Sequence, residues 1–202
     1  MEQKCANCWS PSETKMKSLI ERKKGVFFSP LLHLLIKLKI SANMVSYFSA
    51  IIGLVSTVYL FFDIKISAIL LIISFIIDGI DGSLARITKT DNIQGSITDC
   101  LCDQVVISSS TIGLMSIGIL NPIIGGLYLV TYPLVITFAI LRNLINQPRF
   151  YVFRPRIIGY LVFIVYAFTK IDIINLVTLI LSLTLIFQVI TDFYFLRKYL
   201  HD

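Results

Sequence analysis

The chain reads D-G-I-D-G-S-L-A-R over residues 78–86 and G-S-I-T-D-C-L-C-D over residues 95–103. These two segments place four carboxylates in an otherwise apolar part of the sequence: Asp78, Asp81, Asp99 and Asp103. A charged side chain at the centre of a bilayer costs about 2.5–3.5 kcal/mol. Four such residues therefore indicate that the charges are paired with cations or serve a function. The two segments therefore mark both the organisation of the fold and the candidate site.

Composition places the chain among the polytopic membrane proteins. Of its 202 residues, 56% are hydrophobic and 15% are charged, and the mean hydropathy is +0.82, which excludes a soluble domain. Residues 1–24 are polar and basic and lack the apolar stretch of a signal peptide. The basic residues behind the formal charge of +6 lie between apolar spans, which indicates contact with anionic membrane lipid rather than with nucleic acid.

The expected fold is all-α, with a single membrane domain over residues 1–202 whose residues 1–40 form a cytoplasmic and interfacial segment. Leucines on one face of Pro30–Leu38 predict an amphipathic helix that lies in the membrane interface. Six transmembrane helices are expected to follow, and the fifth is the shortest. Their ranges are Met44–Phe62, Ser67–Arg86, Gly95–Leu120, Ile123–Leu144, Ile157–Phe168 and Ile173–Phe195.

Lys and Arg residues predict the orientation in the membrane. With the N-terminus in the cytoplasm, sixteen of the eighteen basic residues fall in cytoplasmic segments, and only Lys65 and Lys170 fall outside. The positive-inside rule therefore predicts an integral membrane protein with both termini in the cytoplasm, in the plasma or inner membrane if the source is prokaryotic. The four aspartates then lie at the cytoplasmic ends of the second and third spans, where a water-soluble nucleotide reaches them.

Helical spacing brings the aspartates onto one stripe of each span. Asp78 and Asp81 are three residues apart on the second span, and Asp99 and Asp103 are four residues apart on the third. A short loop joins the two spans, so the stripes can face each other and the four carboxylates can converge. Like charges this close require a cation among them. Carboxylate oxygens suit Mg²⁺, Mn²⁺ or Ca²⁺, and four acids are enough for two ions.

Small residues and one arginine share these stripes. Gly82 and Gly95 permit a flat base or a phosphate to approach the helix backbone, and Ala85 widens the same gap. Arg86, one step around the helix, is suited to bidentate binding of phosphate oxygens. For each small residue taken singly, the alternative is close helix–helix packing, which is common in membranes.

Written as a pattern, the stretch is D-x2-D-G-x2-A-R-x8-G-x3-D-x3-D. It resembles the signature of the CDP-alcohol phosphatidyltransferase family at all eight fixed positions and with the family's spacing. The resemblance implies transfer of a phosphatidyl or archaetidyl-type group from a CDP-linked lipid donor to the hydroxyl of a small polar alcohol, with release of CMP. It also implies Mg²⁺ or Mn²⁺, as two ions, and a place in phospholipid biosynthesis.

The residue roles of the family carry over by position. Asp78, Asp81 and Asp99 match metal ligands that grip the diphosphate of the donor. Asp103 matches the residue that completes the metal site and accepts the proton of the attacking alcohol. Gly82, Ala85 and Gly95 match positions that line the cytidine pocket. Arg86 adds a phosphate contact to this expected nucleotide site.

A second resemblance lies at the entrance to the first span. Family members commonly carry Ile-Ser-Pro-Asn-x-x-Thr there, and this chain reads Ile-Ser-Ala-Asn-Met-Val-Ser over residues 40–46. Asn43 matches and is a candidate nucleotide contact, while a helix N-cap is the alternative for this residue. Family analogy further implies a homodimer.

Four arginines between the fourth and fifth spans are the candidate acceptor-binding residues: Arg142, Arg149, Arg154 and Arg156. They suit a phosphate on the acceptor, as in glycerol phosphate or inositol phosphate, or they set the topology beside anionic lipid. Asn143 follows Arg142 where phosphatidylglycerophosphate synthases usually carry Glu, which disfavours glycerol phosphate. Free serine or inositol stays open as the acceptor. Asp192, near the end of the sixth span, is expected to be a surface or interface carboxylate.

Three other functions use similar residues. A CDP-amino-alcohol phosphotransferase acting on diacylglycerol carries the same signature. A divalent cation transporter would use the acids as an ion path, but such a path needs acids at several depths. An isoprenyl diphosphate transferase shares the metal chemistry, but it usually has more spans and two separate D-x3-D-like motifs.

Overall fold

The computed structural model describes residues 29–88, 90, 93–149, 152–153 and 155–201, and within these ranges it contains helices and connecting turns but no strand. The all-α prediction is therefore confirmed for this part of the chain. Seven helices lie in the described ranges: α2 Ser29–Lys37, α3 Ala42–Tyr59, α4 Ile64–Ile87, α5 Ile93–Ser116, α6 Pro122–Leu144, α7 Arg156–Thr169 and α8 Ile174–His201.

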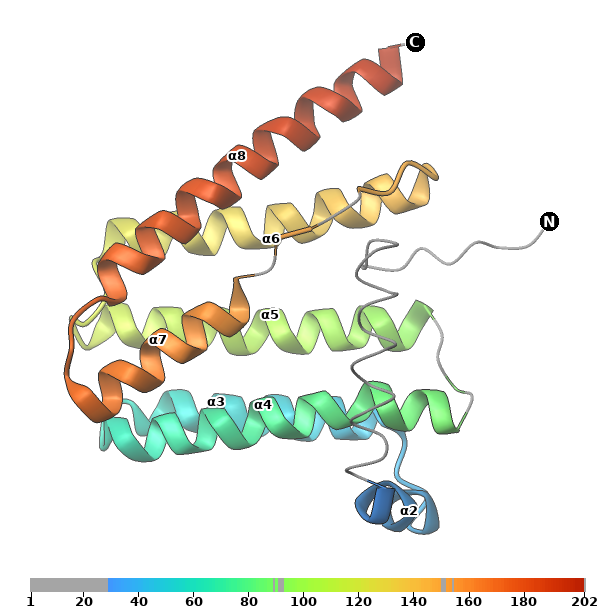
Figure 1. The fold of residues 1–202 in the computed structure, drawn as a ribbon, viewed down its shortest axis with the longest axis vertical. Helices are drawn as coiled ribbons and strands as arrows, with labels where there is room; N and C mark the ends of the chain where they lie inside the picture. Colours follow the sequence, from blue (N-terminus) through green and yellow to red (C-terminus); the bar gives the residue numbers. More distant parts are fainter. Residues whose placement is uncertain (1–28, 89, 91–92, 150–151, 154, 202) are drawn as a thin grey trace.

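The helices form one bundle (Figure 1). α3, α4, α5 and α6 lie roughly parallel or antiparallel to one another, and α7 and α8 cross them obliquely. The turns that join α3 to α4, α5 to α6 and α7 to α8 lie at one end. At the opposite end, α2 packs against α4. The carboxyl ends of α4, α6 and α8 also lie at this end. We call this the α2 end of the bundle.

Polar residues explain where two of the long helices begin. Asp63 caps α4, because its Oδ1 accepts a hydrogen bond from the backbone N–H of Lys65 at 2.8 Å. Asn121 caps α6, because its Oδ1 accepts from the N–H of Ile123 at 2.9 Å. Pro122 occupies the first position of α6. A backbone N–H at this position has no partner within the helix, so proline, which lacks one, is tolerated there.

The helix α3 begins one residue after Ser41. Ser41 Oγ accepts a hydrogen bond from the backbone N–H of Met44 at 3.3 Å, which makes Ser41 the N-cap. Asn43 lies inside the first turn, so the N-cap alternative for Asn43 is wrong. Its role as a nucleotide contact stays a prediction.

Four of the described helices are long and apolar enough to cross a membrane: α3, α4, α6 and α8. α7 is short, with 14 residues. α5 has 24 residues, but Asp99, Asp103 and a run of hydroxyl residues make it more polar. Each predicted span overlaps one helix of the structure. The six-span layout stays a prediction, because α7 is shorter and α5 more polar than the four helices that could cross a membrane. The expected helix Pro30–Leu38 corresponds to α2, and its place in the membrane interface stays a prediction.

Large apolar side chains cover much of the outside of the bundle. Phe62 on the α3–α4 turn is 80% exposed, and Phe187 on α8 is 68% exposed. In water such a surface drives association, whereas the hydrocarbon tails of lipids solvate it well. With the four long apolar helices, this surface indicates a membrane protein.

Buried serine side chains connect α3 to α4. Ser56 Oγ donates to the carbonyl of Ser67 at 2.8 Å, and Ser74 Oγ donates to the carbonyl of Ser49 at 2.8 Å. Hydrogen bonds between membrane helices contribute about 0.6 kcal/mol each on average. These bonds fix how α3 lies against the helix that carries the first two aspartates.

The helix α3 also approaches α5 closely at Gly53. A β-carbon built on Gly53 would lie 2.6 Å from Val106 Cγ1, well inside van der Waals contact. Small residues of this kind allow the backbones of membrane helices to pack close together. The absence of a side chain at Gly53 therefore sets the distance between α3 and α5.

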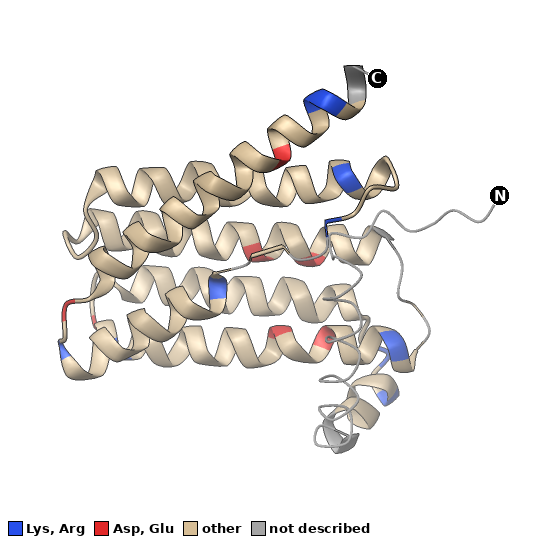
Figure 2. Cartoon of the chain, turned by 45° about the horizontal axis from the view of Figure 1, so that its top comes forward, with Lys and Arg blue, Asp and Glu red and all other residues tan. Residues whose placement is uncertain are grey.

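Basic residues gather toward the α2 end (Figure 2). Lys37, Arg86 and Arg142 lie in the last turns of α2, α4 and α6. Lys170 lies at the opposite end, where it closes α7 in a left-handed conformation with φ of 60°. The side of the membrane that the α2 end faces stays a prediction from the positive-inside rule.

We expect Gly53→Ala to lower the free energy of unfolding by about 1–2 kcal/mol, because the added methyl group overpacks against Val106. The higher helix propensity of Ala opposes this loss by about 1 kcal/mol. Thermal unfolding in detergent micelles measures the difference. The matched control is Gly126→Ala on α6, where a β-carbon meets nothing within 4 Å; this variant should be at least as stable as wild type. Equal stability of the two variants would contradict the close α3–α5 contact.

Candidate active site

Three aspartates meet between α4 and α5. Asp78 belongs to α4, and Asp99 and Asp103 lie one turn apart on α5. Each offers a carboxylate oxygen, and these oxygens all lie within 4.8 Å of one another. All three residues are half-buried. We call them the acid cluster.

The acid cluster fits a divalent cation. Ligands on opposite sides of an octahedral Mg²⁺ lie about 4.2 Å apart, since each Mg–O distance is about 2.1 Å. Carboxylate oxygens are the hard ligands that Mg²⁺ and Mn²⁺ prefer. Three carboxylates at this spacing also repel one another unless a cation lies among them. The residues present therefore suit the metal that the sequence predicts.

Asp81 lies on the same helix as Asp78 but turns toward α3. Its side chain is buried; Oδ2 accepts from Ser46 Oγ, and Oδ1 accepts from the backbone N–H of Gly82, both at 2.5 Å. Asp81 is not part of the group of mutually close oxygens. The structure thus brings together three of the four carboxylates expected to converge, and a metal role for Asp81 stays a prediction.

Arg156, the first residue of α7, reaches the acid cluster. Its Nη2 donates to Asp78 Oδ2 at 2.7 Å, and its Nη1 pairs with Asp103 Oδ1. The guanidinium carbon also lies 5.4 Å from the centre of the Phe75 ring, within the range of a cation–π contact. α7 begins partway along the bundle, which allows its first residue to reach the middle of α4 and α5 (Figure 1). On sequence grounds, Arg156 belongs to the candidate acceptor-binding arginines. In the structure, Arg156 instead contacts the acid cluster.

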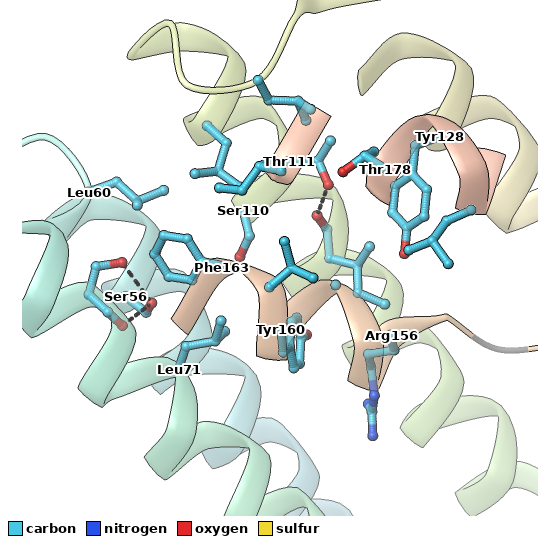
Figure 3. A pocket seen from close by; sticks show the side chains of 18 residues that line it. Ser56, Leu60, Leu71, Ser110, Thr111, Tyr128, Arg156, Tyr160, Phe163 and Thr178 are labelled. Carbon is cyan, nitrogen blue, oxygen red and sulfur yellow. Dashed lines mark hydrogen bonds between the residues drawn. The ribbon is translucent and has the colours of Figure 1, made fainter. Parts of the chain in front are cut away.

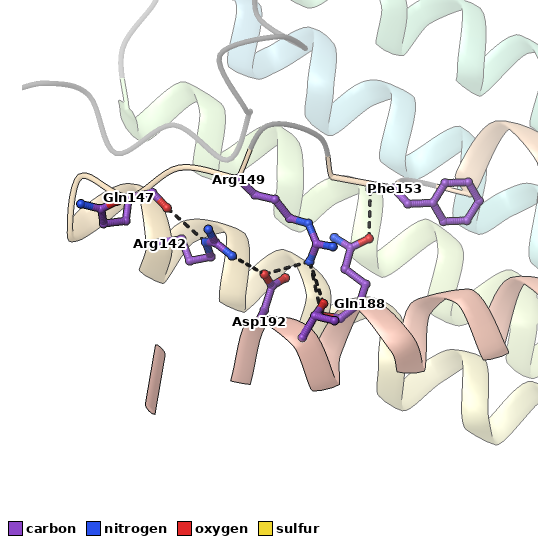
Figure 4. A network of polar contacts seen from close by, with 7 residues as sticks. Arg142, Gln147, Arg149, Phe153, Gln188 and Asp192 are labelled. Atoms are coloured by element: carbon purple, nitrogen blue, oxygen red, sulfur yellow. Dashed lines mark hydrogen bonds and ion pairs between the residues drawn. The ribbon is translucent and has the colours of Figure 1, made fainter. Parts of the chain in front are cut away.

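Two other arginines converge on Asp192 (Figure 4). Asp192 Oδ1 accepts from Arg142 Nη1 at 2.7 Å and from Arg149 Nη1 at 2.9 Å. Asp192 is 1% exposed, so the expectation of a surface carboxylate is wrong, whereas its place at the membrane interface stays a prediction. Its burial is explained by the two cations, because a buried charge persists only when it is paired. We call these three residues the arginine network; it carries a net charge of +1.

Gln188 joins the arginine network to the segment before α7 (Figure 4). Its Oε1 accepts from the backbone N–H of Phe153 at 3.1 Å, and its carbonyl accepts from Arg149 Nη1 at 3.4 Å. Gln188 is buried, and its Nε2 has no hydrogen-bond partner in the described part of the chain. A buried donor of this kind is suited to a ligand oxygen. Arg154 lies outside the described residues.

The expected nucleotide residues lie on the same two helices as the acid cluster. Gly82, Ala85 and Arg86 occupy the last two turns of α4, and Gly95 lies in the first turn of α5. All four are partly exposed. Arg86 Nε donates to the carbonyl of Gly82 at 3.0 Å. Asn43 is half-buried on α3, and the binding roles of all five residues stay predictions.

A mostly apolar cavity of about 60 Å³ lies inside the bundle beside Arg156 (Figure 3). Side chains from six helices line it, and Tyr128, Tyr160 and Thr111 contribute hydroxyl groups. Arg156 is the one residue of the predicted site, as far as the structure describes it, that lines this cavity. The volume holds a few water molecules and not a nucleotide. The described residues that line it include none of the expected nucleotide residues, so the cavity is not the expected nucleotide site.

Three residues of these networks were not among the predicted site residues: Ser46, Gln188 and Asp192. Ser46 had a signal, because it stands at the hydroxyl position of the segment over residues 40–46 that resembles the family. Asp192 had one as well, because it is a charge inside an apolar span, like the other aspartates. Gln188 had a weaker signal, since an amide carries no charge and is less costly to bury.

Comparison with known families gives a match over most of the chain. The profile of CDP-alcohol phosphatidyltransferase matches residues 39–195, which are 157 of the chain's 202 residues. The matched range contains the acid cluster, Arg156 and the arginine network. No match was found among curated proteins.

We expect Asp192→Asn to lower the free energy of unfolding by about 2–4 kcal/mol, because it leaves Arg142 and Arg149 without their buried counter-ion. Chemical denaturation in mixed micelles measures the loss. Asp172→Asn is the control, since Asp172 is exposed at the opposite end of the bundle and should change stability by less than about 0.5 kcal/mol. If Asp192→Asn were as stable as the control, the arginine network would not contribute to the fold.

Proposed function

Because the chain belongs to the CDP-alcohol phosphatidyltransferase family, we propose that it transfers a phosphatidyl or archaetidyl-type group from a CDP-linked lipid to the hydroxyl of a small polar alcohol, with release of CMP. The convergence of Asp78, Asp99 and Asp103 carries this proposal. Cleavage of a diphosphate develops negative charge, and cations held by carboxylates offset it. The products place the activity in phospholipid biosynthesis.

Metal binding is assigned to Asp78, Asp81, Asp99 and Asp103. Mg²⁺ or Mn²⁺, as two ions, supplies positive charge to the donor diphosphate when bound. Three of these carboxylates already lie within reach of one ion, and Asp81 follows Asp78 on α4. The hydrogen bond from Ser46 holds the Asp81 carboxylate in place, as groups that contact metal ligands commonly do.

Asp103 is the proposed catalytic base. It accepts the proton of the acceptor hydroxyl, and the freed oxygen attacks the phosphorus that carries the lipid group. A phosphorus–oxygen bond forms to the alcohol, and the bond from that phosphorus to the oxygen of CMP breaks. CMP leaves with the electron pair of the broken bond. The step is a direct in-line transfer, because the family pattern contains no serine or cysteine nucleophile.

The nucleotide is proposed to bind along α4 and α5 beside the acid cluster. Gly82, Ala85 and Gly95 permit close approach of the cytidine, and the guanidinium of Arg86 suits a phosphate oxygen at the same helix end. Their partial exposure supports this assignment. Asn43 is the proposed contact from α3.

The acceptor is proposed to bind near Arg142, Arg149 and Arg154. The net positive charge of the arginine network suits a phosphate on the alcohol, as does Gln188 Nε2, which has no hydrogen-bond partner among the described residues. Asp192 neutralises part of the charge, so a free alcohol such as serine or inositol fits the same chemistry. The assay below therefore offers both kinds of acceptor.

In the membrane we propose six spans, with the active site and both termini in the cytoplasm. α5 and α7 supply the two spans beyond the four apolar helices. The gathering of basic residues at the α2 end supports the orientation. A homodimer is proposed on family analogy.

We expect Asp103→Asn to lower the rate of CMP release by about 10²–10⁴-fold, the usual contribution of a general base. The assay follows CMP release from CDP-diacylglycerol in detergent with Mg²⁺ or Mn²⁺. The acceptors offered are glycerol 3-phosphate, inositol, inositol phosphate and serine. Asp172→Asn, an exposed acid at the other end of the bundle, is expected to keep the wild-type rate. A folded Asp103→Asn variant with the wild-type rate would contradict the assignment of the base.

The same preparation separates the alternative functions. Turnover of a CDP-amino-alcohol with diacylglycerol, without turnover of CDP-diacylglycerol, would identify an amino-alcohol phosphotransferase. Metal flux into liposomes in the absence of any CDP compound would identify a cation transporter.

We expect Ser46→Ala to raise the metal concentration for half-maximal activity by about tenfold, because Asp81 loses the hydroxyl that holds it. Titration of the CMP-release rate with Mn²⁺ measures this shift. Ser74→Ala is the matched control: it removes a buried hydroxyl from the same α3–α4 contact, but that hydroxyl bonds to a backbone carbonyl. Equal metal requirements in the two variants would argue against a role for Asp81 in metal binding.

A further inference from the structure

We propose that Arg156 serves as the internal cation of the acid cluster before metal binds, so that Arg156 and the divalent cation compete for Asp78 and Asp103. The inference rests on the proposed function, because it takes the acid cluster to be the metal site. It assigns Arg156 a role that differs from that of the arginines near Asp192: the metal displaces its guanidinium, which then pairs with a phosphate of the substrate.

The contacts show that Arg156 and a metal ion require the same two side chains. Arg156 donates to Asp78 Oδ2 at 2.7 Å and pairs with Asp103 Oδ1 through its other terminal nitrogen. Both carboxylates belong to the acid cluster, whose oxygens lie within 4.8 Å of one another. One guanidinium from α7 thereby joins an acid of α4 to an acid of α5, as a bound ion would.

The electrostatics explain why a cation is needed at this position. The side chains of Asp78, Asp103 and Arg156 are only 12%, 19% and 18% exposed. Solvent and salt screen charges at this depth weakly, and clustered carboxylates without a counter-ion are strongly destabilising. Arg156 supplies such a cation to two of the three carboxylates, Asp78 and Asp103. A divalent ion, with twice the charge, is attracted to the same position.

The competition follows because Arg156 and a metal ion use the same two carboxylates. A guanidinium bound to Asp78 and Asp103 lowers the negative potential that a metal ion encounters there and occupies one oxygen of each carboxylate. A divalent ion brings twice the charge and bonds directly to oxygen, so it prevails at sufficient concentration. Removal of the Arg156 charge should therefore strengthen metal binding and weaken the metal-free protein.

The displaced guanidinium has a second favourable contact beside the acid cluster. The Phe75 ring lies 5.4 Å from the guanidinium carbon, within the range of a cation–π contact. Arg156 also borders the cavity of about 60 Å³, but its guanidinium points away from the other side chains that line it (Figure 3). A short movement away from the acids therefore keeps the positive charge beside the metal, where the phosphates of a CDP-linked substrate bind. Metal binding then favours binding of the anionic substrate.

The test is Mn²⁺ binding to the purified full chain in detergent, followed by electron paramagnetic resonance of the free ion without substrate. We expect Arg156→Gln to bind Mn²⁺ about tenfold more tightly than wild type. Its metal-free melting temperature should fall, and the rise on adding Mn²⁺ should be larger. Lys65→Gln is the matched control, because it removes the same charge from an exposed site at the far end of α4; its Mn²⁺ affinity should stay within about twofold of wild type.

Arg156→Lys provides a second variant that keeps the charge but loses the planar fork that spans two carboxylates. We expect its Mn²⁺ affinity to lie between those of wild type and Arg156→Gln. If Arg156→Gln does not fold, the comparison of Arg156→Lys with wild type tests the competition. Unchanged or weaker Mn²⁺ binding in the Arg156 variants overturns the competition. If the wild-type protein still binds Mn²⁺ in that experiment, the proposed function is unaffected and only the competition is wrong. Absence of Mn²⁺ binding in wild type and all variants overturns the metal site and the inference together.

Discussion

Three carboxylates held within 4.8 Å of one another inside a bundle of apolar helices are the constraint that orders this structure. Their mutual repulsion is weakly screened, so each neighbouring element has to bring either a compensating charge or a hydrogen-bond donor. α7 supplies the guanidinium of Arg156, and α3 supplies the hydroxyl of Ser46 to the adjacent Asp81. The apolar packing then has to hold α3, α4, α5 and α7 at the distances that these contacts require. Serine hydroxyls and the bare backbone at Gly53 meet that requirement on the α3 side.

The bundle holds its charges in two units, one rich in carboxylates and one rich in arginines. The acid cluster offers three carboxylates, which are suited to a divalent cation. The arginine network keeps a net charge of +1, which is suited to an anion. A reaction between a metal-bound diphosphate and a polar acceptor needs both kinds of binding in one protein. Burial of each unit is tolerable because the opposite charge is already present within it.

The sequence predicts the helices well, because apolar spans of sufficient length have few other structures available in a membrane. It also predicts that Asp78 faces Asp99 and Asp103, since spacings of three and four residues fix one face of a helix. The fate of individual polar side chains depends on contacts between distant segments. Asp81 shares the stripe of Asp78, but its carboxylate accepts from a serine 35 residues away on α3 and is not among the mutually close oxygens.

The arginines show the same limit. Arg149 and Arg156 are close in sequence, and charge alone does not distinguish them. Arg149 pairs with Asp192, whereas Arg156 pairs with the acid cluster because α7 begins partway along the bundle. The backbone N–H of Phe153 donates to Gln188 Oε1, which attaches a described residue before α7 to α8. Spans and motifs in the sequence do not predict such contacts between distant segments.

The location of bound Mn²⁺ addresses the acid cluster itself. Crystals of the protein grown with Mn²⁺ and measured at the manganese absorption edge locate the ion by its anomalous signal. We expect a peak among Asp78, Asp99 and Asp103, with carboxylate oxygens at about 2.1–2.2 Å and the Arg156 guanidinium moved away from both acids. An anomalous peak at another position, or none at the acid cluster while Mn²⁺ supports CMP release, would contradict the assignment of these three aspartates as the metal site.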